Sequence, residues 1–381
     1  MQNIALENGP VRIVGALDFD RRPTGIVPRR LPNWTRPQVP LFMEIMVTMP
    51  SGVRLEFATT SRTIELDVLP TRIEISKPPA PSVFDLIIDG HPVRSVNTQC
   101  GDRLKINLAD RGKATRERGE AGTVAFTDLP AGLKHCELWL PANAILELRA
   151  LRIDDGVKIE PTPTRLRRRW VHHGSSISHC MEASSPTQTW PAVAARLADV
   201  ELLNLGLGGN CHLDQFVART MRDEPADVLS LKVGINVVNM DSLKERTFAP
   251  ALHGFIDTVR DGKPHTPFLI ASPIYCPSAE THPGPTIPDA HGKFVTLPGH
   301  QEIRNGSLTL QQMRTIIRDV VATRRKHGDT NLHYLDGLEL FGADDAADLP
   351  DDLHPNGAGY VRMGERFYGL AFGRMQPLGG S

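Results

Sequence analysis

A serine near the middle of the chain stands where nucleophilic chemistry is possible. Residues 170–173 (Trp-Val-His-His) predict a short buried strand, and residues 174–177 (Gly-Ser-Ser-Ile) predict a turn of small residues. Gly174 lets the backbone turn sharply and present the next side chains at the carboxyl end of the strand, where α/β enzymes hold their reactive groups. Ser176 is therefore a candidate nucleophile. Gly-Ser-Ser is also common in ordinary loops, so these residues alone leave the role of Ser176 open.

A histidine near the C-terminus is the candidate base. Residues 351–355 read Asp-Asp-Leu-His-Pro. Serine is a poor nucleophile unless a base takes its proton, and an imidazole titrates near neutrality. His354 could accept that proton, and Asp351 could fold back on a tight turn to hold the ring in one tautomer. Asp352 could take the place of Asp351, and an isolated Asp-x-x-His pair is also typical of a surface turn.

Two further segments combine an apolar run with Gly and Asn. Residues 204–210 (Asn-Leu-Gly-Leu-Gly-Gly-Asn) follow the apolar residues 200–203, and residues 233–236 (Val-Gly-Ile-Asn) follow residues 228–231. Each pairing predicts a strand that ends in a loop able to approach a substrate closely. A turn glycine or a helix-capping asparagine is the alternative interpretation.

In this order, the four segments resemble the four sequence blocks of the SGNH hydrolases, also called GDSL hydrolases. The resemblance covers about residues 170–373, and its strength lies in the order of the blocks and in the Asp-x-x-His-Pro element. The family's first block is usually Gly-Asp-Ser-Leu, so Ser175 stands here in place of the aspartate. The resemblance implies a flavodoxin-like α/β domain and an esterase, lipase or acyltransferase activity.

Matching the blocks residue by residue assigns the site. The resemblance implies a catalytic triad of Ser176, His354 and Asp351, because the family spacing favours Asp351 over Asp352. It also implies an oxyanion hole made by the backbone N–H groups of Ser176 and Gly209 and the side-chain amide of Asn236. Such donors stabilise the charged tetrahedral intermediate by about 3 kcal/mol each. Asn239 is the alternative to Asn236 as the side-chain donor of the oxyanion hole.

Composition narrows the class of protein. The 381 residues include 43 basic and 44 acidic ones, and a net charge of −1 gives no reason to expect nucleic acid as a partner. The first 20 residues lack the apolar run of a signal peptide, and no stretch has membrane-spanning length, so we expect a cytoplasmic protein. The five cysteines are scattered without metal-ligand spacing, which predicts free thiols and no metal site.

The two halves of the chain differ in pattern. Residues 1–160 are expected to form an all-β sandwich, because short period-two runs alternate with polar turns, and a carbohydrate-binding-like domain is one interpretation of it. Residues 161–381 are expected to form the α/β catalytic domain, because strand and helix patterns alternate there as a parallel sheet requires. The predicted strands of the first half are residues 43–47, 54–57, 63–68, 72–75, 84–91, 105–108, 123–126 and 137–140.

Several other features of the sequence lie outside the predicted catalytic residues. His172, His173 and His179 flank Ser176, but no carboxylate cluster accompanies them, so packing or solvated roles are favoured. Cys180 is expected to pack. The basic run 165–169 predicts a solvated edge, with contact to a phosphate of coenzyme A as the alternative. Residues 275–298 lack a periodic pattern and predict a lid or substrate loop.

The resemblance also points to a function. An N-terminal sandwich joined to an SGNH domain implies an acyltransferase that moves an aromatic acyl group, such as salicylyl, from a coenzyme A thioester to a hydroxyl of a glycosylated polyketide of the tetracycline type. Acyl-coenzyme A would be a co-substrate, and no bound cofactor is expected. A carboxylesterase or acetylesterase that hydrolyses a small or sugar ester is one alternative. A carbohydrate-binding protein with a degenerate hydrolase domain is the other.

Overall fold

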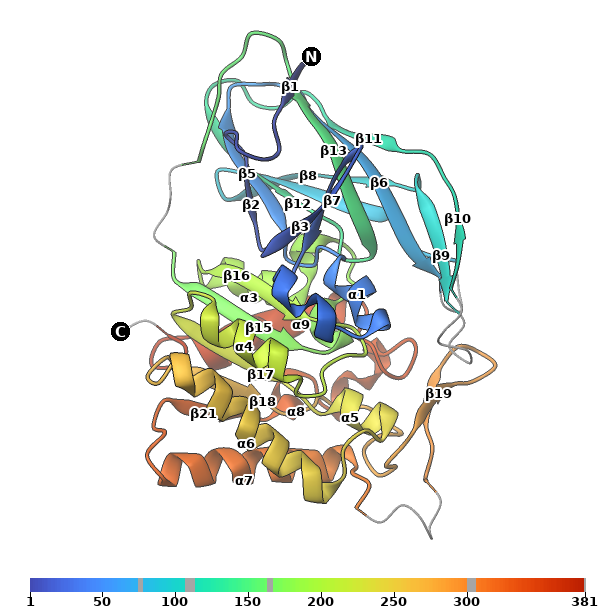
Figure 1. Cartoon of the computed structure of the whole chain (residues 1–381), viewed down its shortest axis with the longest axis vertical. Coiled ribbons are helices and arrows are strands. Elements are labelled where there is room, and N and C mark those ends of the chain that lie inside the picture. The colour runs from blue at the N-terminus through green and yellow to red at the C-terminus, as the bar shows by residue number, and fades with distance from the viewer. Residues whose placement is uncertain (75–77, 107–113, 163–166, 300–305, 380–381) are drawn as a thin grey trace. The chain divides into compact units, whose positions relative to one another are not determined.

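The chain divides into two compact units. The computed structural model describes residues 1–74, 78–106, 114–162, 167–299 and 306–379 (Figure 1). Unit 1 comprises Met1–Leu166 and Ala183–Thr187, and unit 2 comprises Arg167–Glu182 and Gln188–Ser381. Within unit 1, the buried carboxylate of Asp85 accepts hydrogen bonds from Ser185 and Thr187.

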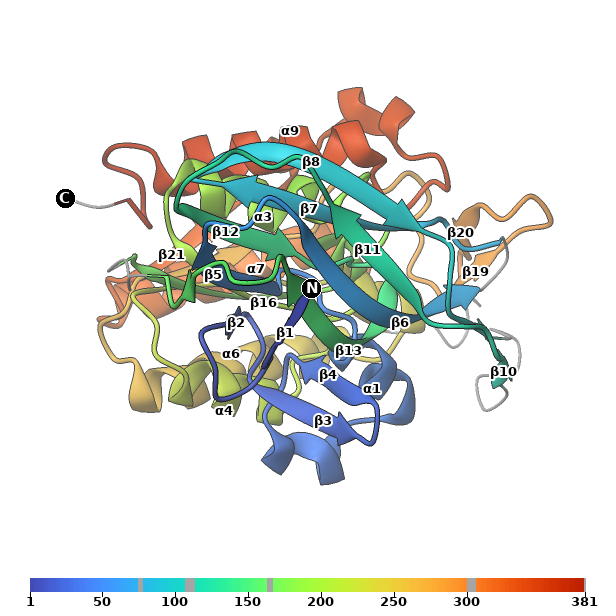
Figure 2. The ribbon, with the colours of Figure 1, turned by 90° about the horizontal axis from the view of Figure 1, so that it is seen from above.

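Unit 1 is built from two sheets (Figure 2). One sheet has the order β10-β9-β6-β13-β4-β3, with β1 paired to β13 and β11 paired to β6. The other has the order β14-β5-β12-β7-β8, with β2 paired to β5. The strands are β1 (Gln2–Ile4), β2 (Arg12–Val14), β3 (Asp18–Arg22), β4 (Gly25–Arg29), β5 (Arg54–Thr59), β6 (Ile64–Glu74), β7 (Ser82–Ile88), β8 (His91–Thr98), β9 (Asp102–Ile106), β10 (Ala114–Glu117), β11 (Gly122–Phe126), β12 (Lys134–Trp139), β13 (Ala144–Ile153) and β14 (Ile159–Glu160).

Alternation along the strands creates the core between these sheets. Ile64, Leu66 and Val68 of β6 are fully buried, whereas the residues between them are half-buried. Phe84 and Leu86 of β7, on the other sheet, belong to the same hydrophobic cluster. Because side chains of a strand point alternately to its two faces, this pattern buries one face of each sheet against the other. The predicted sandwich is confirmed.

Two of the predicted strands, residues 63–68 and 72–75, are parts of one strand, β6. Pro70 lies inside β6, where its missing N–H would normally cost a ladder bond. However, β11 pairs only with residues 64–68 of β6, and β9 pairs only with residues 71–74, so Pro70 falls in the gap between these two partners. Residue 75 and residues 107–108 of the predicted strands lie outside the described residues.

Residues 43–47 form part of a helix, so the strand predicted there is wrong. Helix α1 (Leu41–Val47) buries Met43, Met46 and Val47, which have the i, i+3, i+4 spacing of one helical face. Over five residues, Met43, Ile45 and Val47 also fit a period of two. The local pattern therefore did not distinguish a helix from a strand.

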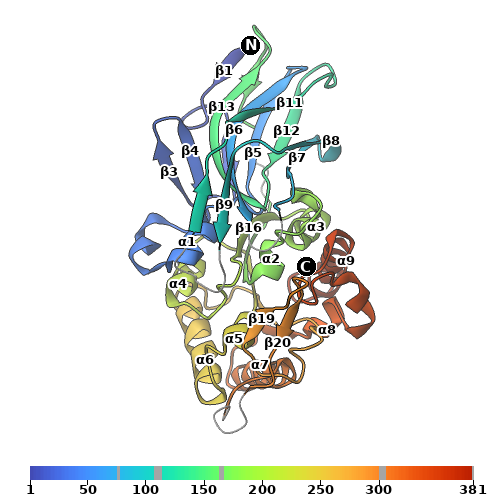
Figure 3. The same cartoon turned by 90° about the vertical axis from the view of Figure 1, so that its right-hand side faces the viewer.

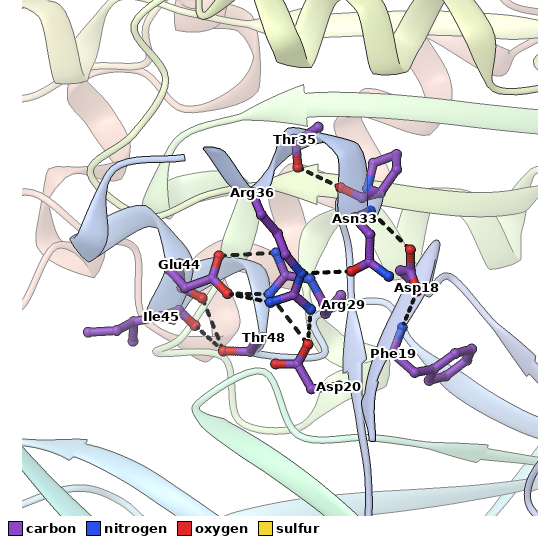
Figure 4. Close-up of polar contacts among 11 residues, drawn as sticks. Asp18, Phe19, Asp20, Arg29, Asn33, Thr35, Arg36, Glu44, Ile45 and Thr48 are labelled. Carbon is purple, nitrogen blue, oxygen red and sulfur yellow. Dashed lines mark hydrogen bonds and ion pairs between the residues drawn. The ribbon is translucent and has the colours of Figure 1, made fainter. Parts of the chain in front are cut away.

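A cluster of ion pairs fixes α1 and the 3₁₀ helix η1 (Asn33–Gln38) to the β3–β4 hairpin (Figure 4). The Arg29 side chain is fully buried and contacts both carboxylate oxygens of Glu44, with its Nη2 3.0 Å from Oε2. Arg36 pairs with Asp20 and lies 3.5 Å from Glu44. A buried guanidinium needs such partners because an unpaired buried charge is strongly destabilising.

Unit 2 is a parallel α/β domain. Its sheet has the order β16-β15-β17-β18-β21, and every neighbouring pair is parallel. This is the 2-1-3-4-5 order of flavodoxin-like folds, so the predicted fold class is confirmed. A separate antiparallel pair, β19–β20, lies within residues 275–298. The strands are β15 (Arg169–Gly174), β16 (Glu201–Gly206), β17 (Val228–Lys232), β18 (Phe268–Ala271), β19 (Thr286–Pro288), β20 (Phe294–Thr296) and β21 (Leu332–Leu335).

Helices cover both faces of this sheet (Figure 3). Helices α3 and α9 pack on each other, and α6 packs on α4 and α7. Among the described residues, no helix combines the length and the hydrophobicity that crossing a bilayer requires. The helices are α2 (Ser176–His179), η2 (Pro186–Gln188), α3 (Trp190–Leu197), α4 (Gln215–Asp223), α5 (Ile235–Met240), α6 (Glu245–Gly262), α7 (Leu310–Lys326), α8 (Gly337–Leu340), η3 (Ala343–Asp348), α9 (Gly357–Phe367) and the π-helical turn η4 (Tyr368–Phe372).

Glu44→Ala should destabilise unit 1 by about 2 kcal/mol, because the buried Arg29 would keep only Asp20, 3.8 Å away, as an ionic partner. Urea unfolding followed by circular dichroism measures the change. Glu7→Ala is the matched control, since Glu7 pairs with the exposed Arg21 and its loss should cost less than about 1 kcal/mol. Equal effects of the two substitutions would show that the Arg29 cluster does not stabilise the unit.

Candidate active site

The Ser176 hydroxyl lies at the carboxyl end of β15, an inner strand of the sheet. Ser176 is the first residue of α2, and Ser175 is its N-cap, with a side chain that accepts a hydrogen bond from the N–H of Ile177. From Val171 to Cys180, every residue except Ser176 is buried. The turn therefore leaves the Ser176 side chain accessible and buries its neighbours.

The need for glycine at position 174 is steric. A Cβ placed on Gly174 would lie 2.3 Å from the Ser178 Oγ, so a side chain there would push α2 off the end of the strand. Gly174 is not among the residues with positive φ. The sequence argument placed the glycine correctly but gave a different reason, a sharp backbone turn.

A buried polar chain supports this turn from below. Trp170 Nε1 donates to Ser230 Oγ at 2.8 Å, and Ser230 Oγ lies 2.7 Å from His172 Nδ1. His172 Nε2 lies 2.8 Å from the Oγ of Ser178, which is in α2 with Ser176. Burial lowers the pKa of His172 well below its usual value, so the ring is neutral near pH 7. His172 thus packs in the core and positions α2, which is the structural role that the sequence analysis favoured.

His354 meets Ser176 across 178 positions of sequence. His354 Nε2 lies 2.9 Å from Ser176 Oγ, and His354 Nδ1 lies 2.7 Å from Asp351 Oδ2. His354 therefore lies within hydrogen-bonding distance of the two other side chains that the family blocks predicted for the triad. His354 is 8% exposed, which leaves its ring largely shielded from water.

Asp351 uses its two oxygens for different purposes. Its Oδ1 accepts hydrogen bonds from the backbone N–H groups of Leu353, at 3.0 Å, and His354, at 2.6 Å. Its Oδ2 accepts from the His354 ring. Burial would raise the pKa of Asp351, but these hydrogen bonds and the histidine charge outweigh it and lower the pKa. The carboxylate therefore stays ionised and fixes both the loop and the ring.

Asp352 points elsewhere. It has a φ of 61°, a left-handed conformation that Asp tolerates better than most residues, and its carboxylate lies 3.0 Å from Lys293 Nζ. The geometry thus separates the two adjacent aspartates that the sequence left as alternatives: Asp351 contacts His354 and Asp352 contacts Lys293.

A second carboxylate lies near His354, and sequence analysis missed it. Glu182 Oε1 is 4.0 Å from His354 Nδ1. Burial alone would lower the pKa of His354, but Glu182 and Asp351 outweigh it and raise the pKa to about 9. No motif in the sequence marks Glu182; only its place six residues after Ser176 could have drawn attention to it.

The three predicted oxyanion donors follow three adjacent strands. Ser176 follows β15, Gly209 follows β16 and Asn236 follows β17, and Gly174 lies level with the last residues of both neighbouring strands. Among the described residues, none accepts a hydrogen bond from the backbone N–H of Ser176 or Gly209 or from the side-chain N–H₂ of Asn236. Gly209 has a φ of 69°, which a residue with a Cβ rarely adopts.

The amide orientation of Asn236 follows from its partner. Its Oδ1 accepts a hydrogen bond from the backbone N–H of Cys211 at 3.0 Å, which leaves Nδ2 to face the other way. Asn236 is 3% exposed. Its rival Asn239 accepts a hydrogen bond from Thr286 of β19, at 2.8 Å, and so anchors the β19–β20 hairpin.

That hairpin contacts the histidine loop. The backbone N–H of Phe294 in β20 donates to Asp351 O at 2.8 Å, and the Phe294 ring packs edge-on against His354 with centroids 5.6 Å apart. The segment predicted as a lid or substrate loop thus contains a short hairpin whose aromatic residue covers one side of the imidazole.

The remaining predicted features are structural. His173 is buried, with Nδ1 2.7 Å from Leu205 O, and His179 is also buried. Burial raises the pKa of Cys180 well above its usual value, which keeps the thiol protonated and inert. No group of metal-ligating side chains occurs in the part of the chain that the structure describes.

The basic run lies at the other end of the sheet. Residues 165 and 166 are outside the described residues. Arg167 pairs with Asp199, and Arg169 pairs with Glu201, both at the amino end of β15. Five residues of strand, roughly 16 Å, separate Arg169 from Gly174. This placement favours the solvated edge over contact with a ligand bound at Ser176.

Comparisons with known proteins agree with this fold. Residues 173–362 match the model of the GDSL-like lipase/acylhydrolase family. The structure of the salicylyl acyltransferase SsfX3 from a tetracycline biosynthetic pathway is 27% identical, with a TM-score of 0.79 over 96% of this chain and 95% of that one. No curated protein sequence matches the chain.

Two more distant structures show the same fold. A putative GDSL-like lipase from Bacteroides ovatus is 18% identical, with a TM-score of 0.67 and coverage of 94% of each chain. An active-site mutant of a family two carbohydrate esterase from Clostridium thermocellum is 15% identical, with a TM-score of 0.60 over 94% of this chain and 96% of that one. The family model and the order of the parallel sheet together lead to one conclusion: residues 173–362, about half of the chain, form a domain of the GDSL-like lipase/acylhydrolase family.

Proposed function

We propose that the protein transfers acyl groups through a covalent acyl-serine at Ser176. The observation that carries this proposal is the continuous line of contacts from Ser176 Oγ to His354 Nε2, at 2.9 Å, and from His354 Nδ1 to Asp351 Oδ2, at 2.7 Å. This is the geometry of a nucleophile, a general base and an orienting carboxylate. Retention of all three also disfavours a degenerate domain that only binds carbohydrate.

In the first half-reaction, Ser176 Oγ attacks the carbonyl carbon of the acyl donor while His354 Nε2 takes the hydroxyl proton. With Nδ1–H donating to Asp351, the neutral ring has its lone pair on Nε2, which is the tautomer that the reaction requires. The N–H groups of Ser176, Gly209 and Asn236 would stabilise the oxyanion. The C–S or C–O bond then breaks, and His354 returns its proton to the leaving thiol or alcohol.

In the second half-reaction, a hydroxyl of the acceptor gives its proton to His354 and attacks the acyl-serine, which releases the product ester and restores Ser176. Water in place of the acceptor would give hydrolysis with the same groups. The outcome depends on how well the site excludes water and orients an alcohol.

We propose an aromatic acyl-coenzyme A as donor and a hydroxyl of a glycosylated polyketide as acceptor. Support comes from the 27% identity to the salicylyl acyltransferase SsfX3, which extends over 96% of this chain and includes both units. The similarity supports the salicylyl group, whereas the basic run at the amino end of β15 adds no support for coenzyme A as its carrier, which the acylation experiment tests.

Incubation with salicylyl-coenzyme A should add one salicylyl mass to the protein. Intact-protein mass spectrometry with a panel of acetyl, benzoyl and salicylyl thioesters measures the adduct, and peptide mapping should place it on Ser176. The adduct should be absent in Ser176→Ala, with turnover lower by about 10⁴-fold or more.

Ser178→Ala is the matched control, because Ser178 lies two residues after Ser176 in α2 but contacts His172 instead of His354. It should still form the adduct on Ser176, at a lower rate because the contact with His172 that positions α2 is lost. An adduct that persists in Ser176→Ala would overturn the nucleophile assignment. A fluorophosphonate probe that fails to label the folded protein would favour the binding-protein alternative.

Asp351→Asn should lower kcat/KM by about 10³- to 10⁴-fold, because the amide can hold the imidazole in the wrong tautomer and cannot stabilise its protonated form. Asp352→Asn loses only a pair with the half-exposed Lys293 and should stay within about threefold of the wild type. Steady-state hydrolysis of a nitrophenyl ester compares the two variants. A larger loss in Asp352→Asn would reverse the assignment.

Asn236→Ala should lower kcat by about 10²- to 10³-fold, as removal of one oxyanion donor does. Asn236→Asp separates donation from positioning, because a carboxylate can still accept from Cys211 N–H but cannot donate to the oxyanion. If donation is the role, the Asp variant should be at least as slow as the Ala variant. Near-normal turnover in Asn236→Asp would assign Asn236 to loop structure only.

A further inference from the structure

Glu182 stands on the far side of the His354 ring from Ser176. Its Oε1 is 4.0 Å from Nδ1, too far for a hydrogen bond but close enough for a strong charge interaction. The Glu182 side chain is 32% exposed, and it belongs to unit 2 together with Ser176 and His354. The same nitrogen thus faces two carboxylates, Asp351 by hydrogen bond and Glu182 by charge.

Tyr360 of α9 fixes the position of Glu182. The Tyr360 hydroxyl donates to Glu182 Oε2 at 3.0 Å, and the Tyr360 side chain is fully buried. Burial, followed by the charge of Glu182, raises the pKa of Tyr360 well above its usual value. The phenol therefore stays protonated and acts as a permanent donor, which leaves Oε1 as the oxygen nearest the histidine.

Few other charges lie close to this ring. Asp351 is on its own loop, and Cys180, at the end of α2, is buried with its pKa raised, so it is uncharged. From the hairpin, Phe294 covers the ring without charge, and Lys293 pairs with Asp352. Among the described residues, Glu182 is the second negative group that acts on His354.

We propose that Glu182 is a positioning residue that, held by Tyr360, stabilises the imidazolium form of His354 during proton transfer from Ser176. The inference rests on the proposed function, since it gives Glu182 a role in the same proton transfer. The charge of Glu182 has two opposing effects. It favours proton uptake in the transition state, and it also favours protonation of the resting enzyme, which removes the base.

The sign of the pH effect follows from the second effect. A protonated imidazole cannot accept the serine proton, so acylation should rise with pH through the pKa of His354, which lies at about 9. Without the charge of Glu182 this pKa should fall, and the rising limb of the pH–rate profile should move to lower pH. The basicity of the ring falls with it, so the maximal rate should also decrease.

Glu182→Gln tests the proposal, because glutamine keeps the shape and can still accept from Tyr360. The rate of fluorophosphonate labelling of Ser176 is measured from pH 5 to 10. We expect the limb to move down by about one pH unit and the plateau to fall about three- to tenfold, with the rate at low pH unchanged or slightly raised. A variant damaged in structure would instead be slower at every pH.

Two further variants serve as controls. Tyr360→Phe removes the hydroxyl and should shift the limb in the same direction, and adding it to Glu182→Gln should have no further effect, because both act through one interaction. Glu365→Gln neutralises an exposed carboxylate of the same helix α9 and should leave the limb in place.

NMR titration of ¹³C-labelled histidine gives a reading that does not depend on activity. The His354 signal is assigned by its absence in His354→Gln. If Ser176 does not label but the His354 pKa still falls in Glu182→Gln, the proposed function fails and the electrostatic contact stands. An unchanged His354 pKa and an unchanged labelling limb in Glu182→Gln would overturn the role of Glu182.

Discussion

One imidazole joins parts of unit 2 that are far apart in sequence. The contact between His354 and Ser176 spans 178 positions, so it exists only if β15, which lies between β16 and β17 in the sheet, and the loop before α9 are both fixed in place. Ordering these segments costs conformational entropy that one hydrogen bond of about 1 kcal/mol cannot offset. The packed sheet and its helices supply the difference. The reactive pair is therefore a consequence of the core beneath it and contributes little to holding that core together.

The core beneath the serine is unusual in being polar. Trp170, Ser230, His172 and Ser178 form a buried chain in which each member has a partner, and such chains rigidify a structure only when they are fully satisfied. An apolar residue at position 172 would leave the hydroxyls of Ser178 and Ser230 without this partner. This series of hydrogen bonds fixes the first turn of α2, and that turn sets the orientation of Ser176. Histidine beside a nucleophile thus has a structural use that is distinct from catalysis.

The sequence was most informative where a local pattern is sufficient. The parallel strands were predicted because short apolar runs alternate with helical patterns, and Ser176, Asp351 and His354 were predicted because they stand in short ordered blocks. Prediction failed where tertiary partners decide. Residues 43–47 fit two periods, and packing with Arg29 of β4 accompanies the helix. The sequence predicted two strands, residues 63–68 and 72–75, where the structure has β6 alone, because Pro70 falls between the two neighbouring strands β11 and β9. Glu182 has no motif at all, because its effect comes from a ring that lies 172 positions away in sequence.

In the proposed function the same triad serves transfer and hydrolysis, so the choice between them must come from elements around it. The β19–β20 hairpin is one such element, and it is not independent of the triad: Phe294 binds Asp351 through its backbone and covers His354 with its ring, while Lys293 binds Asp352. Any movement of the hairpin that admits or excludes water therefore acts on the loop that holds His354. A site coupled in this way can link the approach of an acceptor to the alignment of His354. An alcohol that orders the hairpin would gain over water, which makes no such contacts.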